Sequence, residues 1–291
     1  MPIPKVAVVT GCSTGFGRVI AETLARHNCR VFAGMRDIKG RNSEKAREVR
    51  EYAAKHSVAL SPIEIDVTVD ASVDSAITEV IREAGQIDVL VNNAGLTVRG
   101  VAEAVTVEQT RRIFETNVFA VQRMNRAVLP HMRKRKTGLL IHISSQAGRI
   151  VLPGLGTYGA SKAALESLVE SYHYELAAQG IDAVLIQPGA FATAIAQNAD
   201  KAADEQTESA YGPGAEIPKT MMGNLGKRRD PQEVADAVLK LVETPAGKRP
   251  LRTGVGVNGE FVAELNAFTD KIQTTVVDLF GLKDLTKFRS N

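Results

Sequence analysis

The sequence predicts a doubly wound α/β domain with a parallel sheet, and two observations support this prediction. Six or seven short runs of apolar and β-branched residues alternate with segments of helical periodicity, a pattern typical of parallel strands joined by helical crossovers. No break in composition divides the 291 residues. We therefore expect one domain over residues 1–291, with a long irregular segment at residues 190–229 and an extra helical tail at about residues 258–291.

The composition excludes several classes of protein. A formal net charge of +3 is too small to indicate nucleic acid or an acidic membrane surface as a partner. Cys12 and Cys29 cannot form a disulfide framework and have no metal-ligand spacing to a histidine, so we expect a cytoplasmic protein without a metal. The chain has no run of about 18 apolar residues and no leader-like start, and we expect no membrane span.

The first strand is predicted at residues 5–10, and a glycine-rich turn at residues 11–17 leads from it into a helix that reaches residue 25. A helix N-terminus approached through glycines offers free backbone N–H groups to a phosphate. The spacing is G-x-x-x-G-x-G. The turn is therefore either a nucleotide-phosphate site or an ordinary connection between a strand and a helix.

The second strand is predicted at residues 30–34 and is followed by Met35, Arg36 and Asp37, before a polar helix at residues 43–55. In a doubly wound sheet this strand end lies beside the adenosine ribose of a bound dinucleotide. There an acidic residue binds the 2′-hydroxyl and an arginine accommodates a 2′-phosphate. Arg36 is thus either a phosphate ligand or a solvated charge.

The third and fourth strands are predicted at residues 58–65 and 87–91. Asp66, after the third, either contacts an adenine or begins the helix around residues 73–81. The fourth runs into Asn-Asn-Ala-Gly at residues 92–95, which also suits a simple tight turn.

A loop to Gly100 and a long helix at about residues 107–135 are predicted next. Asn117 falls in the apolar interior of that helix. It is either a hydrogen-bonding residue of the core or a member of the site. The basic run at the end of the helix is interpreted as a solvated helix terminus.

The most informative stretch is residues 138–164. A buried strand at residues 139–143 stops at Ser144 and Ser145, and a helix from Tyr158 to about residue 178 follows. Tyr158 and Lys162 are four residues apart and share one helix face. An ammonium beside a phenol lowers the phenol's pKa from about 10, which suits a general acid or base. The alternative is an exposed Tyr and Lys at a helix start.

The last third of the chain contains a strand at residues 182–186 that ends in Gln187, Pro188 and Gly189. Residues 190–229 show no clear strand, and such segments are often lids or binding loops. A helix at residues 231–242 and an edge strand at residues 250–255 follow. Residues 260–282 have apolar residues at helical spacing, and they either cover the site or form a subunit contact.

The candidate ligand-binding residues gather at the carboxyl ends of the predicted strands, where doubly wound sheets bind their ligands. The candidates for cofactor binding are Gly11, Ser13, Thr14, Gly15, Phe16, Gly17, Arg36, Asp66, Val67, Asn93, Ala94, Gly95, Tyr158, Lys162, Pro188, Gly189, Phe191 and Thr193. The candidates for catalysis are Asn117, Ser145, Tyr158 and Lys162.

In their order along residues 3–245, these motifs resemble the short-chain dehydrogenase/reductase family. The resemblance implies a Rossmann-type fold, a nicotinamide cofactor and reversible oxidation of an alcohol to a carbonyl. It implies that Tyr158 is the acid/base and that Lys162 lowers its pKa and holds the nicotinamide ribose. It also implies that Ser145, with Ser144 as the second choice, binds the substrate oxygen and that Asn117 supports a proton-relay water.

The resemblance also bears on the cofactor. NAD-specific relatives usually have an acidic residue where this chain has Met35, and NADP-specific relatives often have a basic residue at the next position, here Arg36. We expect NADP, with NAD as the second choice. The neighbouring Asp37 opposes this interpretation, as does the lack of a basic residue just before Gly15.

The substrate is expected to be a small carbonyl compound or secondary alcohol, lipophilic and steroid- or retinoid-like by analogy alone. We expect a homodimer or homotetramer, although the tail after about residue 245 departs from the family's shared core. Two other functions stay open. One is a cofactor-binding regulator without turnover, and the other is an isomerase or dehydratase that uses the cofactor transiently.

Overall fold

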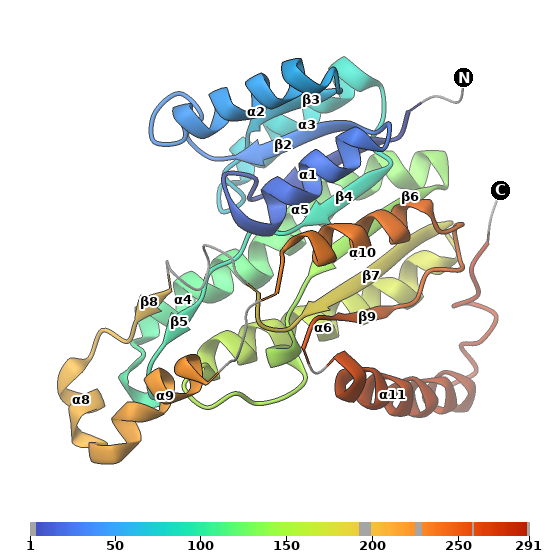
Figure 1. Ribbon diagram of the computed structural model, residues 1–291. Helices are drawn as coiled ribbons and strands as arrows, with labels where there is room; N and C mark the ends of the chain where they lie inside the picture. Colours follow the sequence, from blue (N-terminus) through green and yellow to red (C-terminus); the bar gives the residue numbers. More distant parts are fainter. Residues whose placement is uncertain (1–3, 192–198, 225–228, 258, 290–291) are drawn as a thin grey trace.

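A computed structural model describes residues 4–191, 199–224, 229–257 and 259–289 (Figure 1). Its centre is a sheet of seven parallel strands in the order β3-β2-β1-β4-β6-β7-β9. The strands are β1 (Val6–Thr10), β2 (Arg30–Met35), β3 (Leu60–Glu64), β4 (Val89–Asn92), β6 (Gly138–Ile143), β7 (Ile181–Pro188) and β9 (Arg252–Val255). The predicted doubly wound α/β fold is confirmed.

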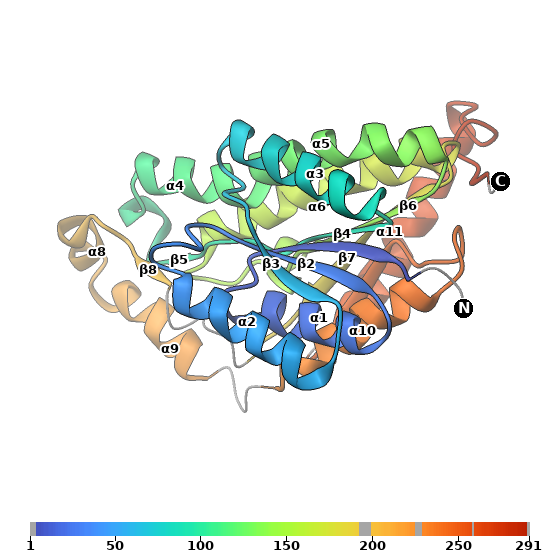
Figure 2. The ribbon, with the colours of Figure 1, turned by 90° about the horizontal axis from the view of Figure 1, so that it is seen from above.

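Helices cover both faces of the sheet (Figure 2). One face carries α1 (Gly15–Arg26), α2 (Ser43–His56) and α10 (Gln232–Glu243). The other carries α3 (Asp70–Ala84), α5 (Ala120–Arg135) and α6 (Gly156–Ala177). Side chains alternate between the faces along each strand, so Ala7 and Val9 join the first core while Val6 and Val8 join the second.

The helix predicted at residues 107–135 is one continuous rod with a change of winding inside it. It consists of α4 (Val107–Phe114), the π-helical turn η2 (Glu115–Phe119) and α5. A capping box between Thr106 and Gln109 begins α4. The wider turn changes the helical register and directs Asn117 inward, where it is completely buried. Single π turns are frequent at functional sites.

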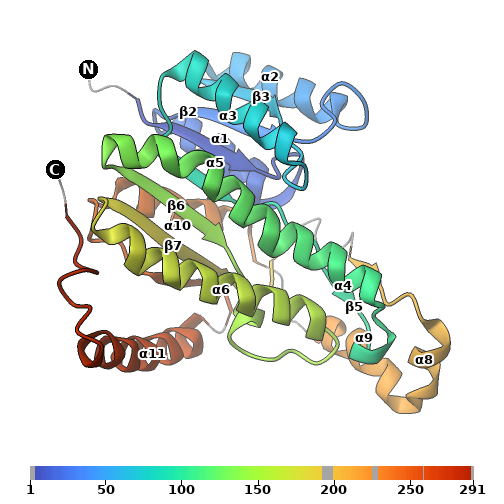
Figure 3. The same cartoon turned by 180° about the vertical axis from the view of Figure 1, so that it is seen from behind.

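A lobe stands beyond the carboxyl ends of the central strands (Figure 3). Its elements are β5 (Val98–Arg99), η1 (Ala102–Ala104), β8 (Asp200–Lys201), α8 (Glu205–Ala210), η4 (Gly212–Glu216) and α9 (Ile217–Gly223). The predictions of a plain loop up to Gly100 and of no strand in residues 190–229 are therefore wrong, because β5 and β8 pair in parallel. Two residues are too short a strand to show a periodicity, and a small apolar core around Val98, Ile113 and Ala202 stabilises the pair.

The C-terminal part forms the far edge of the molecule. The edge strand β9 pairs with β7, and α11 (Gly259–Leu279) lies beside β9 (Figure 1). The predicted helical tail is thus confirmed. Among the helices that the structure describes, none combines the length and the apolar character needed to cross a bilayer.

Candidate active site

The carboxyl ends of the sheet strands border a cleft of about 830 Å³. It brings together most of the predicted residues: Gly11, Ser13, Thr14, Gly15, Phe16, Arg36, Asp66, Val67, Asn93, Ala94, Gly95, Ser145, Tyr158, Lys162, Pro188, Gly189 and Phe191. Gly17 and Asn117 do not line the cleft but lie directly behind it. Thr193 lies outside the residues that the structure describes.

The glycine-rich turn forms a close-packed cradle at the N-terminus of α1. Gly11 and Gly15 have φ values of +71° and +61°, a region that side chains disfavour. A Cβ on Gly17 would lie 2.4 Å from the carbonyl oxygen of Gly11, so this glycine serves the packing of helix against turn. Asn93 Nδ2 donates to the Thr10 carbonyl at 2.8 Å and ties the turn to β4. The cradle fits a phosphate-bearing cofactor, because a helix N-terminus that is reached through glycines leaves backbone N–H groups free for an anion.

The loop after β2 orients two arginines toward the same end of the cleft. Arg36 and Arg41 are both exposed and both line it. The Asp37 carboxylate turns back into its own loop and accepts the Arg41 backbone N–H at 2.8 Å. Glu64 accepts the backbone N–H groups of Asp37 and Ile38. Sequence reasoning missed Arg41, since only the fold of this loop brings it beside Arg36.

Asp66 lies near these arginines and also shapes its own turn. Its Oδ1 accepts the Thr68 N–H at 3.0 Å and the Thr68 hydroxyl at 2.6 Å. Partial burial opposes ionisation, but the Thr68 hydrogen bonds and the charges of Arg36 and Arg123 lower the pKa of Asp66. Asp66 therefore begins the turn before α3, as one of the two interpretations predicted. It also lines the cleft, and a contact with an adenine stays a prediction.

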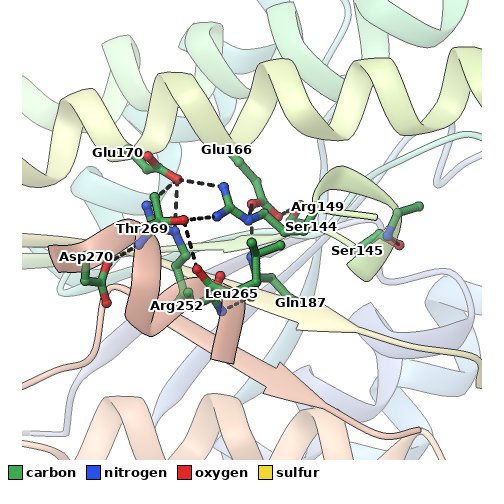
Figure 4. A network of polar contacts seen from close by, with 12 residues as sticks. Ser144, Ser145, Arg149, Glu166, Glu170, Gln187, Arg252, Leu265, Thr269 and Asp270 are labelled. Carbon is green, nitrogen blue, oxygen red and sulfur yellow. Dashed lines mark hydrogen bonds and ion pairs between the residues drawn. The ribbon is translucent and has the colours of Figure 1, made fainter. Parts of the chain in front are cut away.

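The two serines after β6 have different surroundings. The Ser144 hydroxyl donates to Glu166 Oε1 at 2.6 Å and is buried (Figure 4). Ser145 Oγ accepts the Ala147 N–H at 3.1 Å, and its side chain is hydrogen-bonded to that of Tyr158. Ser145 is therefore the serine whose hydroxyl adjoins the phenol.

Tyr158 and Lys162 lie side by side at the start of α6. Lys162 Nζ lies 5.9 Å from the centroid of the Tyr158 ring and donates to the Ile143 carbonyl at 2.8 Å. Burial lowers the pKa of Lys162 to about 8, although Glu166 opposes this shift.

The expected lowering of the Tyr158 pKa is not found. Burial raises the pKa of Tyr158, and only the hydrogen bond with Ser145 opposes the rise. The physical reason is that burial removes water from the phenolate, and the contacts around the ring stabilise the phenolate less than that water would. The shift therefore favours the protonated form of Tyr158.

Asn117 connects three elements behind the cleft. Its Oδ1 accepts the Leu96 N–H at 2.8 Å, while Nδ2 donates to the Leu96 carbonyl at 3.0 Å and to Ser161 Oγ at 2.9 Å. A Cβ on Gly95 would lie 3.3 Å from Asn117 Oδ1 and 3.8 Å from Lys162 Nζ. Gly95 thus leaves room between the amide and the ammonium.

A buried carboxylate that sequence reasoning missed lies one helical turn beyond Lys162. Glu166 is 2% exposed and accepts hydrogen bonds from Ser144 and from Gln187 Nε2 at 2.9 Å (Figure 4). Burial raises its pKa, and the nearby Arg149 opposes this rise. The spacing from Lys162 was a signal in the sequence, but the partners come from β6 and β7 and are distant along the chain.

The other end of the cleft is mainly apolar. Its side chains come from the loop before α6, from the segment after β4 and from the lobe: Leu96, Ile150, Leu152, Leu155, Ala199 and Met221. Phe191, after the Pro188-Gly189 turn, packs edge-on against Phe16 with the ring centroids 5.4 Å apart. The site therefore has a phosphate cradle and two arginines at one end, hydroxyl donors beside an ammonium at its centre, and an apolar chamber at the other end.

Comparisons with known proteins show which proteins this chain is similar to. A family model described as short chain dehydrogenase matches residues 5–204. An uncharacterized oxidoreductase, YusZ, of Bacillus subtilis is 37% identical over 244 residues, 81% of this chain and 84% of that protein. The 3-ketodihydrosphingosine reductase of Bacteroides thetaiotaomicron is 36% identical over 195 residues, 67% of each chain.

Solved structures give the same result. A short-chain dehydrogenase from Streptomyces avermitilis superposes with a TM-score of 0.76 at 30% identity, covering 97% of this chain and 98% of that one. An alcohol dehydrogenase from Thermococcus sibiricus complexed with 5-hydroxy-NADP has a TM-score of 0.69 at 26% identity, covering 86% and 95% of the two chains.

Proposed function

The chain belongs to the short-chain dehydrogenase/reductase family of oxidoreductases, and we propose that it transfers a hydride between NADP(H) and a carbonyl compound or secondary alcohol. The observation that carries this proposal is the convergence of Ser145, Tyr158 and Lys162 in the cleft that also contains the glycine cradle. A bound nicotinamide would supply or accept the hydride, so the protein has to orient the reactants and manage one proton.

In the proposed mechanism, Ser145 and Tyr158 donate hydrogen bonds to the carbonyl oxygen as negative charge develops there during reduction. The Tyr158 hydroxyl then gives up its proton. Its raised pKa keeps that proton in place until the substrate oxygen becomes basic. Lys162 would hold the cofactor ribose and stabilise the phenolate left behind, and Asn117 would support a proton-relay water.

We propose a preference for NADP over NAD. Arg36 and Arg41 can both pair with a 2′-phosphate, and Met35 leaves no carboxylate at the position where one would accept the ribose hydroxyls. Asp37 weakens this preference less than the sequence suggests, because its carboxylate binds its own loop. The remaining cofactor contacts are assigned to the cradle, to Asp66 and Val67, to residues 93–95 and to residues after Pro188.

The substrate is proposed to be lipophilic, since the chamber beyond Tyr158 is lined mainly by aliphatic side chains. One relative is named for reduction of a keto compound, which favours a ketone. A steroid- or retinoid-like compound remains an analogy. We further propose that the chain forms one domain and acts in the cytoplasm as a homodimer or homotetramer.

A spectrophotometric screen tests the proposed function. Ketones, aldehydes and secondary alcohols are offered with each cofactor, and the absorbance of the reduced nicotinamide is followed. Net oxidation or reduction of the cofactor that depends on substrate and on Tyr158 supports the proposal. Conversion of substrate without net change in cofactor would instead indicate an isomerase or dehydratase, and binding of cofactor without any turnover would indicate a regulator.

A further inference from the structure

We infer that the substrate carries an anionic group, a carboxylate or a phosphate, which Arg99 binds at the apolar end of the cleft. This inference rests on the proposed function, since it names a class of compound for the same site.

The backbone of β5 fixes the direction of Arg99. Val98 is 2% exposed and packs into the small core of the lobe. Successive side chains of a strand point to opposite faces, so Arg99 points away from that core, and it lines the cleft together with Thr97. The Ala202 N–H donates to the Arg99 carbonyl at 2.7 Å, and the Gly100 N–H donates to the Gly154 carbonyl at 3.1 Å. The guanidinium therefore projects from a backbone that is held on both sides.

Arg99 is half-buried, yet its guanidinium makes no hydrogen bond or ion pair within the described residues. Other half-buried arginines of this chain, such as Arg18 and Arg123, face carboxylates. Arg99 instead borders the open cleft, where a bound ligand could reach it. The position of Arg99 is thus explained if a ligand supplies the counter-charge.

The acidic side chains of this chain do not supply that charge. Asp66 is the one acidic residue that lines the cleft among the described residues, and it lies at the arginine pair of the other end. Residues 192–198 and 225–228, which adjoin the cleft in sequence, contain no Asp or Glu. Glu208 lies on the other face of β5, since its Oε1 would be 3.2 Å from a Cβ on Gly100. The register partner of Arg99 on β8 is Lys201, a second cation.

Aliphatic side chains from Leu96, Leu152 and Leu155 also line this end of the cleft. A guanidinium pairs with carboxylate or phosphate oxygens through two parallel hydrogen bonds. The ligand that matches both features has an apolar body with its carbonyl at Tyr158 and an anionic end at Arg99.

The test compares acids with their neutral esters. Specificity constants kcat/KM are measured for 4-, 6- and 8-oxodecanoate and for their methyl esters, with wild type, Arg99→Gln and Arg99→Lys. Wild type should prefer at least one acid over its ester by about 10- to 100-fold, as expected for a charge-assisted contact. The ratio should fall to about 1 in Arg99→Gln and be partly retained in Arg99→Lys. Arg111→Gln, an exposed residue of α4 paired with Glu108, is the matched control and should keep the wild-type ratio.

Binding of decanoate to the protein loaded with NADP⁺, measured by calorimetry, separates this inference from the proposed function. If Arg99→Gln weakens the binding of decanoate about tenfold or more, the anion site is supported, even when no carbonyl compound is turned over. Absence of turnover would refute only the proposed function. Equal use of acids and esters by wild type, or an unchanged ratio in Arg99→Gln, overturns the assignment of Arg99. Inorganic phosphate as a competitor shows whether the site also accepts phosphate.

A different observation carries a second proposal. We propose that α11 pairs in antiparallel orientation with the α11 helix of a second copy of this chain. Figures 1 and 3 both place this helix at the rim of the molecule, beyond β9. Its surface is divided into a docked face and a free apolar stripe.

The docked face uses polar contacts with the rest of the chain. Asn266 Nδ2 donates to Gln187 Oε1 at 2.7 Å, Arg149 donates to Thr269 Oγ1 at 2.6 Å, and Asp270 pairs with Arg252 (Figure 4). These contacts leave the neighbouring face of the helix exposed. The exposed stripe consists of Phe261 (66% exposed), Leu265 (36%), Phe268 (62%), Ile272 (50%) and Leu279 (77%).

The stripe has the spacing of a coiled-coil seam and is self-complementary. Successive residues of the stripe are four, three, four and seven positions apart, which is the spacing of the heptad repeat. In an antiparallel pair centred between Leu265 and Phe268, each Leu265 meets the second copy's Phe268, and each Phe261 meets the second copy's Ile272. Glu264 and Lys271 flank the stripe on its outer side. The same register brings each Glu264 near the second copy's Lys271. The apolar contacts and the charge pairs therefore both favour a second copy of this chain as the partner.

Charge reversal tests this pairing on exposed residues, where folding is not at risk. The dimer dissociation constant is measured by sedimentation for Glu264→Lys, Lys271→Glu and the double variant. Each single change should weaken the dimer about three- to tenfold, and the double change should restore it. Leu265→Glu combined with Phe268→Glu should weaken it by about 100-fold or more. Glu108→Lys on α4 is the control and should leave the dissociation constant unchanged.

A monomeric wild type, or a dimer that is insensitive to Leu265→Glu with Phe268→Glu, overturns the proposal. So does a monomer that binds phosphatidylcholine/phosphatidylglycerol vesicles through Phe268, since the stripe would then face a membrane. Failure of the double variant to restore a dimer weakened by both single changes contradicts the antiparallel register.

Discussion

The centre of the cleft and the end beside Arg36 and Arg41 are built in different ways. The centre around Tyr158 and Lys162 rests on sheet strands and on α6, and there the removal of water determines the ionisation: it raises the pKa of Tyr158 and lowers that of Lys162. The end around Arg36 and Arg41 is an exposed loop. There partial burial acts to raise the pKa of Asp66, but hydrogen bonds and neighbouring charges lower it overall. Buried positions should therefore control the chemistry, and exposed positions should adjust the choice of ligand.

The largest effect is expected for Tyr158→Phe. This change would remove the proposed proton donor and almost no volume, so kcat should fall by about 10²- to 10⁴-fold while the cofactor dissociation constant stays within about threefold. Steady-state kinetics and fluorescence titration with NADPH measure the two quantities. Tyr172→Phe is the control on the same helix, because its hydroxyl bonds only to Gln122 among the described residues and does not line the cleft. A kcat within threefold of wild type would exclude Tyr158 as the acid.

The second prediction concerns the pH dependence of stability at Lys162. Its folded pKa of about 8 is below its usual 10.5, so between these pH values the unfolded chain binds the proton and the folded chain does not. The unfolding free energy should therefore rise with pH across this window, by up to about 3 kcal/mol. Lys162→Met should lack this rise. Urea unfolding of the cofactor-free protein at pH 7.5 to 10 measures the difference, and parallel curves for the two proteins would contradict a buried, titrating ammonium.

At the exposed end, the effect should be on the choice between cofactors. Arg36→Ala and Arg41→Ala should each lower the ratio of kcat/KM for NADPH over NADH by about 10-fold, and the double variant by about 100-fold, because each would remove one proposed, partly solvated contact to the 2′-phosphate. Arg82→Ala, an exposed arginine outside the cleft, provides the control. If wild type uses both cofactors equally, these arginines do not recognise the phosphate.

The smallest effect is expected for Asp37→Asn. The carboxylate binds the backbone of its own loop, and the residue has a φ of +52° that asparagine tolerates. The cofactor ratio should change by less than about threefold. A tenfold gain in the preference for NADPH would instead show that Asp37 neutralises Arg36, as the sequence alone suggested.

Local patterns were sufficient to predict much of this protein. Periodicity predicted the alternating strands and helices, and most of the site residues predicted at strand ends line the cleft. Residues that are four apart share a face in any α-helix, so the proximity of Tyr158 and Lys162 could be derived without a tertiary structure. The choice of Ser145 over Ser144 came from family resemblance, and the contacts of Ser144 with Glu166 now give it a physical reason.

The remaining features depend on residues that meet only when the chain folds. Ser144 and Glu166 are 22 residues apart, Asn117 and Ser161 are 44 apart, and Gln187 and Asn266 are 79 apart. The direction of a pKa shift also belongs to this level, because it depends on how much water the assembled elements exclude, and a single helix face cannot predict that. The sequence by itself determined which residues share an element and which strand ends share an edge. Only the tertiary structure decided which side chains are buried together, which of them keep a partner, and that Arg99 keeps none among the described residues.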